Sequence, residues 1–128
     1  RPVYDGVEAK RLGRSSSGVL QTRRDGWLTY YKFLWFNLTC FFDALVLHDL
    51  DAIILGDPRP VADRYLKRTG APLAAQAEGA ARGFAGLRSH VLLAKANRTV
   101  FDRLVAKADA GDFVVYTNTD QDIIENYF

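Results

Sequence analysis

Residues 32–57 read KFLWFNLTCFFDALVLHDLDAIILGD. In this stretch a short apolar run at residues 44–47 leads to two carboxylates, Asp49 and Asp51, and a second apolar run follows at residues 52–55. Each run is short, apolar and bounded by polar residues, which is typical of a buried strand. Two acids at the end of a buried strand are costly unless something neutralises them. Hard divalent cations such as Mg²⁺ or Mn²⁺ prefer oxygen ligands, so the pair predicts a metal site that holds a phosphate.

The sequence on either side of this stretch predicts further helices and strands. Helices are expected over residues 26–38, 60–67 and 97–108, and from Thr119 or Asp120 to the end of the chain. Strands are expected over residues 73–77, 91–94 and 113–116. The buried face of the first helix is expected to comprise Trp27, Leu28, Tyr31, Leu34, Trp35 and Leu38. That of the third helix is expected to comprise Val100, Phe101, Leu104, Val105 and Ala108, with Asn97 as the N-cap and Gly111 at the end.

Strands and helices alternate along the chain, and this order favours an α/β layer architecture. Residues 1–24 show weak periodicity and predict an irregular segment, and residues 78–86, rich in Gly and Ala, predict a loop. The length of 128 residues corresponds to one domain or part of one. Because the chain contains no Met and its last predicted helix runs to Phe128, we expect it to be a segment of a longer domain.

Composition and charge exclude some classes of function. Hydrophobic residues make up 48% and charged residues 25%, which is the balance of a soluble globular protein. The formal net charge of +2 is too small to predict a nucleic-acid partner. No apolar run approaches the ~18 residues that a membrane span needs, so no membrane segment is expected. No targeting segment is visible either, and the compartment stays open.

The spacing of the two acids indicates what they can do together. In open α/β sheets, ligands bind beyond the carboxyl ends of the strands, which is where Asp49 and Asp51 are predicted to lie. With one residue between them, their side chains leave the same side of an extended chain. Both can then face one cation, which would hold a diphosphate and offset its charge as it leaves. The plain alternative is that both acids are solvated turn residues.

An ordered set of residues surrounds the pair. It comprises Lys32, Leu38-Thr39, Phe42-Asp43, the apolar residues 44–47, Asp49-Leu50-Asp51 and Ile53-Ile54-Leu55. Near the end of the chain a predicted strand, a helix, a Gly-containing turn and then Asp120-Gln121 follow. This order resembles the nucleotide-diphospho-sugar transferases, most closely the family 8 glycosyltransferases that include glycogenin and the bacterial galactosyltransferases. The resemblance covers residues 32–128, roughly three quarters of the chain.

The resemblance implies a fold and an activity. Residues 25–128 would form the central part of a GT-A-like (Rossmann-like) nucleotide-sugar transferase domain, truncated at its C-terminus, with a mixed sheet flanked by helices. The activity would be that of a metal-dependent glycosyltransferase. It would move a sugar from a nucleotide-diphosphate donor, with UDP favoured, to an unidentified acceptor hydroxyl with retention of configuration.

The resemblance also implies roles for individual residues. Asp49 and Asp51 would ligate Mn²⁺ or Mg²⁺ and approach the ribose and diphosphate of the donor. Lys32 would lie over the phosphate or sugar of the donor, although a solvated helix lysine is the plain alternative. Asp120 would sit beside the donor sugar and Gln121 would hydrogen-bond to its hydroxyls. The alternative for these two is a helix N-terminus, where the helix dipole favours an acid.

Three positions, Arg88, His90 and His48, depart from the pattern of this family. The Asn-Ser-Gly that the family has ahead of its second strand reads Arg88-Ser89-His90 here, so only Ser89 carries over as a substrate-binding candidate. His48 stands where the family has an apolar residue. A histidine in such a run is more often part of the core than a ligand, although His48 could touch the metal shell as a neighbour of Asp49.

Two other functions remain open at this point. A phosphatase of the haloacid dehalogenase type also ends a hydrophobic strand in Asp-x-Asp, with Asp49 as nucleophile and Asp51 as general acid. Against it, Ile53 stands where that family has Thr or Val, and Lys32 and Asp120 would have no role. The third possibility is a non-catalytic domain that keeps the transferase fold without turnover.

Overall fold

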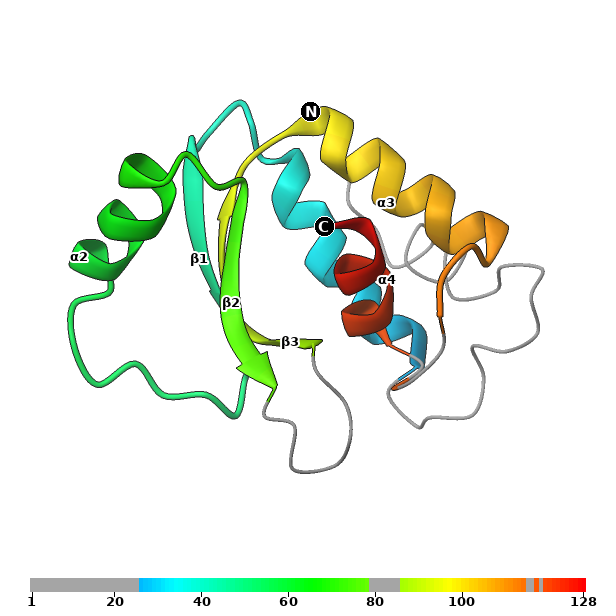
Figure 1. Cartoon of the computed structure of the whole chain (residues 1–128), viewed down its shortest axis with the longest axis horizontal. Coiled ribbons are helices and arrows are strands. Elements are labelled where there is room, and N and C mark those ends of the chain that lie inside the picture. The colour runs from blue at the N-terminus through cyan, green and yellow to red at the C-terminus, as the bar shows by residue number, and fades with distance from the viewer. Residues whose placement is uncertain (1–25, 79–85, 115–116, 118) are drawn as a thin grey trace. The chain divides into compact units, whose positions relative to one another are not determined.

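The computed structural model describes residues 26–78, 86–114, 117 and 119–128, and these form two compact units (Figure 1). The first unit takes its residues from Arg1–Leu38 and Asn97–Phe128, and the second is Thr39–Ala96. The irregular segment predicted at residues 1–24 lies outside the described residues, as does most of the loop predicted at residues 78–86.

The second unit is built on a three-stranded sheet in the order β1-β3-β2 (Figure 1). The strands are β1 (Ala44–His48), β2 (Leu73–Glu78) and β3 (Gly86–Lys95), which confirms the three predicted at residues 44–47, 73–77 and 91–94. Both pairings of β3 are antiparallel, so the expectation of a mixed sheet is wrong for the described strands. The linker from Glu78 to Gly86 is too short for a parallel crossover, which needs about a dozen residues or more.

The strand predicted at residues 52–55 is absent, because the chain turns directly after β1. The N–H of Ala52 donates to the carbonyl of Asp49 at 3.0 Å and closes that turn. Ile53 is 82% exposed and Leu55 is 95% exposed, so the apolar run points into solvent. Hydrophobic content alone suggested this strand, but a strand also needs a pairing neighbour, and no described strand pairs with these residues.

One helical segment packs against β2 and β3 in this unit. It begins as α2 (Arg59–Ala62) and continues as the wider π-type helix η3 (Asp63–Arg68), which confirms the helix predicted at residues 60–67. Pro60 lies in its first turn, where a missing N–H costs no hydrogen bond. The segment ends before Gly70, whose φ of 71° is in the left-handed region that glycine tolerates.

The described residues of the first unit include the helices η2, α3 and α4, which pack against one another (Figure 1). The first is η2 (Gly26–Asn37), which confirms a helix at the predicted place but is of the 3₁₀ type. Its buried residues are Tyr30, Phe33 and Phe36, each at most 1% exposed. This spacing of three follows from the 3₁₀ helix, which has three residues per turn.

The buried face predicted for this helix is therefore wrong. That face was derived from the spacing of an α-helix, which selects different positions. Trp35, expected in the core, is 40% exposed, and Tyr31, Leu34 and Leu38 are half-buried. The side chains of Trp27 and Leu28 lie outside the described part of the structure.

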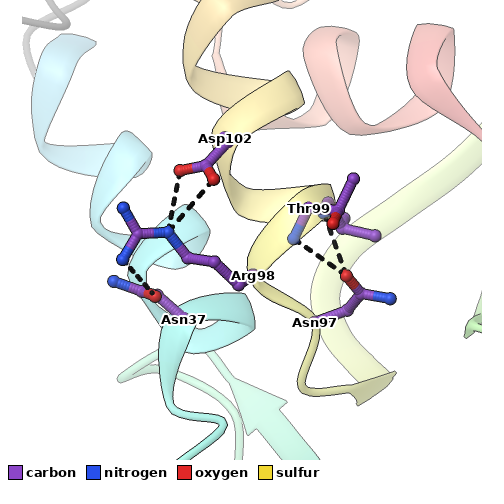
Figure 2. Close-up of polar contacts among 6 residues, drawn as sticks. Asn37, Asn97, Arg98, Thr99 and Asp102 are labelled. Carbon is purple, nitrogen blue, oxygen red and sulfur yellow. Dashed lines mark hydrogen bonds and ion pairs between the residues drawn. The ribbon is translucent and has the colours of Figure 1, made fainter.

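Helix α3 (Arg98–Ala110) matches its prediction at both ends. The Oδ1 of Asn97 accepts hydrogen bonds from the N–H groups of Thr99 at 2.9 Å and Val100 at 3.2 Å, as an N-cap does (Figure 2). Gly111, with a φ of 67°, ends the helix. Of the predicted face, Val105 is half-buried and the others are buried, namely Val100, Phe101, Leu104 and Ala108.

Helix α3 is also tied to the end of η2. The N–H of Asn97 donates to the carbonyl of Phe36 at 2.7 Å. The guanidinium of Arg98 bonds the carboxylate of Asp102 at 2.9 Å and the side-chain oxygen of Asn37 at 3.3 Å (Figure 2). These contacts fix where the chain re-enters the first unit.

Helix α4 (Asp120–Tyr127) confirms the last predicted helix, with Thr119 as its N-cap. Ile123 and Ile124 are fully buried, and the helix packs against η2 and α3. The strand predicted at residues 113–116 is not formed at Phe113 and Val114, and its other half lies outside the described residues. None of the helices in the described part of the chain is long and apolar enough to cross a membrane.

Candidate functional site

Asp49 and Asp51 lie in the second unit, in the turn that follows β1. The strand ends at His48, and the N–H of Asp49 donates to the carbonyl of His90 at 2.9 Å. The carbonyl of Asp49 then accepts the N–H of Ala52. Because the chain turns here, the argument from side-chain alternation in an extended chain is wrong, although the two acids remain close in sequence on one tight turn.

The environment of the two acids also differs from the expected one. Asp49 is half-buried and Asp51 is exposed, so neither carboxylate is forced to find a neutralising ion. Over the described residues, no group of three or more His, Cys, Asp or Glu side chains is arranged to hold a metal ion. A cation at this turn would take its remaining ligands from water and from substrate phosphates, which is how Mg²⁺ is commonly bound.

His48 is exposed, so the interpretation of it as a core histidine is wrong. Its Nδ1 lies 2.9 Å from the carbonyl oxygen of Asp49 and donates a hydrogen bond to it. His48 thus stabilises the start of the turn that carries the two acids.

Two of the predicted residues of the first unit meet as an ion pair. The Nζ of Lys32 lies 3.3 Å from the Oδ2 of Asp120, and the two side chains are 19% and 2% exposed. The N–H of Asp120 also donates to the Oγ1 of Thr29 at 3.1 Å. Lys32 is therefore not a solvated helix lysine, because its charge balances a carboxylate that is removed from water.

The N-terminus of α4 is organised by a residue that the sequence analysis did not select. Asp122 is 3% exposed, and its Oδ1 accepts hydrogen bonds from the N–H of Thr117 at 2.9 Å and from its hydroxyl at 2.7 Å. The hydroxyls of Thr117 and Thr119 are 2.7 Å apart. These bonds fix the chain just before Asp120 and Gln121. The pattern of Thr and Asp at a helix start was the available signal.

Tyr30 is the second group that sequence reasoning missed. It is 1% exposed, and its hydroxyl has no hydrogen-bond partner among the described residues. Burial raises the pKa of Tyr30 above its ordinary value of 10.0, and the nearby carboxylates of Asp120 and Asp122 raise it further. The helical spacing used for prediction placed its neighbour Tyr31 on the buried face instead.

The two remaining predicted site residues are Gln121 and Ser89. Gln121 is half-buried, and its N–H donates to the Thr119 hydroxyl at 3.4 Å within the helix cap. Ser89 lies on β3 and is 7% exposed, which leaves little of its surface for a ligand. Lys32, Asp120 and Gln121 thus belong to the first unit, and Asp49, Asp51 and Ser89 to the second.

Comparisons with known proteins gave no relative for this chain: no protein-family model, no curated protein and no solved structure matches it.

Proposed function

We propose that this chain is part of a metal-dependent glycosyltransferase that uses a nucleotide-diphosphate sugar, with UDP favoured, and transfers the sugar to an acceptor hydroxyl with retention. The observation that carries the proposal is the turn of Asp49, Leu50 and Asp51 at the end of β1. The hydrogen bond from Asp49 to the His90 carbonyl anchors this turn. Its two carboxylates remain at least partly exposed, so they can bind a cation that also holds a diphosphate.

Each group would contribute a distinct part of the chemistry. Mn²⁺ or Mg²⁺ bound by Asp49 and Asp51 would offset the charge on the leaving diphosphate. Lys32 would place its positive charge beside the phosphate or sugar oxygens of the donor. Gln121 would hydrogen-bond to the hydroxyls of the donor sugar. Asp120, whose side chain is 2% exposed, would act through its ion pair with Lys32.

Calorimetric titration of UDP into the chain, with and without Mn²⁺, tests the proposal. We expect binding that requires Mn²⁺ and that weakens at least tenfold in the Asp49→Ala/Asp51→Ala variant, because the metal would lose both protein carboxylates. The matched control is Asp63→Ala/Asp102→Ala. It removes the same charge from two exposed acids that each pair, among the described residues, with a helix neighbour four residues away.

Turnover of UDP-glucose and UDP-galactose, followed by release of UDP, completes the test. UDP binding that is equal in the wild type and in the Asp49→Ala/Asp51→Ala variant would contradict the proposed site. So would the absence of binding in a chain that circular dichroism shows to be folded. Metal-dependent hydrolysis of p-nitrophenyl phosphate that is lost in Asp49→Ala would instead favour the phosphatase. UDP binding without turnover would favour the non-catalytic domain.

A further inference from the structure

The second unit contains a cleft of about 390 Å³ between the α2–η3 helix and the sheet. Val61 and Tyr65 line it from the helix, and Ala74 of β2 and Val91 and Leu93 of β3 line it from the sheet. Leu93 is 8% exposed, whereas Val61 is 50% and Tyr65 45% exposed. The cleft therefore has an aliphatic floor in which Leu93 is buried and Ala74 and Val91 are half-buried, and it has an open rim, so a ligand can enter it without unfolding the unit.

The cleft exists because the sequence places small residues under the helix. β2 reads LAAQAE, and Ala74 pairs with Leu93 across the sheet without filling the space above it. Protein interiors are otherwise packed about as densely as organic crystals, so a gap of this size between packed elements leaves apolar surface in contact with water. An apolar ligand would remove that surface from water, which is favourable.

The size and position of the cleft indicate what would bind there. An apolar cavity of about 150 Å³ holds one benzene molecule, so a cleft of about 390 Å³ has room for an alkyl chain of about eight carbons. Its floor begins at Val91, which lies opposite His48 in the sheet. The preceding residue, His90, accepts the hydrogen bond from Asp49. A ligand whose alkyl chain lies on Val91 would thus have its polar end beside the turn that carries Asp49 and Asp51.

We propose that this cleft binds the alkyl part of an amphipathic acceptor, whose sugar or hydroxyl end lies at the Asp49–Asp51 turn. This inference rests on the proposed transferase function for the identity of the ligand as an acceptor. The aliphatic side chains of the floor contact the alkyl chain of the ligand. The Tyr65 hydroxyl and the Gln76 amide, both exposed side chains that line the cleft, are donors for the polar end.

Titration of octyl glucoside below its micelle-forming concentration, with methyl glucoside as the control ligand, tests the site. Each fully buried methylene strengthens binding by about fourfold, so burial of about four of the methylenes of the octyl chain should already make the octyl compound bind at least ~100-fold more tightly than the methyl compound. The methyl NMR signals of Val61, Val91 and Leu93 should shift during the octyl titration. Equal affinity for the two glucosides, or shifts confined to other methyl groups, would overturn the proposal.

Two variants connect the binding to the cleft. Ala74→Leu fills the floor and should weaken octyl binding at least tenfold, whereas Ala77→Leu adds the same group at an exposed position on the same strand and should not. Val61→Asn puts a polar group on the rim and should also weaken binding; it serves if Ala74→Leu does not fold. Octyl binding that survives in every folded cleft variant would overturn the proposal.

The two proposals fail in different ways. The octyl titration needs neither UDP nor metal, so it tests the cleft independently of donor and metal binding. Octyl binding at the cleft together with a failed UDP titration would contradict the transferase function and the role of the ligand as an acceptor. A successful UDP titration without octyl binding would overturn only the cleft.

Discussion

At the scale of single residues, the pairing of Lys32 with Asp120 is a contact that neither the ordered motif nor periodicity predicted, although the motif had selected both residues. The two residues lie 88 positions apart, which is the difference between 120 and 32, and the structure brings their charges to 3.3 Å. Nothing in the local sequence of either residue requires this. Removing water from a carboxylate is costly, so a buried acid needs a partner of this kind whatever its role in function.

Replacing Lys32 with Met should therefore destabilise the chain by about 3 kcal/mol, because it leaves the carboxylate of Asp120 buried without its counter-ion. Urea unfolding followed by circular dichroism measures the loss. The double variant Lys32→Met/Asp120→Leu should recover most of it, since neither position then carries a charge that needs a partner. Lys67→Met is the control: it breaks the exposed pair with Asp63 and should cost less than about 1 kcal/mol. A Lys32→Met chain as stable as the wild type would mean that solvent reaches Asp120.

Tyr30 makes the stability of the chain sensitive to alkaline pH. Its pKa in the folded state is raised above the ordinary value of 10.0, so the folded chain holds this proton more tightly than the unfolded chain. The contribution to stability is therefore complete below about pH 10 and is lost as the pH rises above that value, by up to about 1.4 kcal/mol per pH unit.

Thermal unfolding between pH 8 and pH 11 tests this dependence. The melting temperature of the wild type should fall more steeply above pH 10 than that of Tyr30→Phe, which has no proton to lose at this position. Tyr65→Phe is the matched control, because Tyr65 is 45% exposed. Identical alkaline profiles for the wild type and Tyr30→Phe would show that Tyr30 does not titrate in this range.

At the scale of elements, the sequence predicted best where a residue type has a local structural effect. Asn97 and Gly111 bracket α3 as expected, because a side-chain cap and a left-handed residue act on their own backbone. The helix at residues 26–38 was predicted but its buried face was not. Its 3₁₀ spacing, with Tyr30, Phe33 and Phe36 buried, is hidden in a run that is aromatic or aliphatic at almost every position.

The strand that was predicted at residues 52–55 is not formed, which shows where local sequence is not sufficient for prediction. Its hydrophobicity matches that of β1, but strand formation depends on a neighbour that can be distant in sequence. β1 has its partner in β3, whereas the chain after Asp51 turns and leaves Ile53 and Leu55 in solvent. The same turn holds the acids of the candidate site. The residues of that site could be selected from the sequence, but their turn geometry and their exposure could not.

At the scale of the whole molecule, helices and a sheet are both present, so the broad α/β class is plausible and the finer GT-A-like fold remains a proposal. The division into two units separates Lys32 and Asp120 from Asp49 and Asp51. Sequence order predicted these residues as one set, because a motif records order along the chain. The hydrogen bonds of Asp122 lie outside such a motif, and only the three-dimensional structure shows them.

The exposed aliphatic side chains after β1 should make the protein self-associate in solution. Leu50, Ile53 and Leu55 are 105%, 82% and 95% exposed within one short segment, and grouped apolar side chains in water favour association. In sedimentation velocity at increasing concentration, the wild type should show a rising average mass. The Leu50→Ser/Ile53→Ser/Leu55→Ser variant should remain at 14.3 kDa. Val114→Ser, which removes a 75% exposed valine from the first unit, should behave as the wild type does. A wild type that stays monomeric at every concentration would contradict this account, because it would mean that these side chains contribute no measurable attraction between molecules.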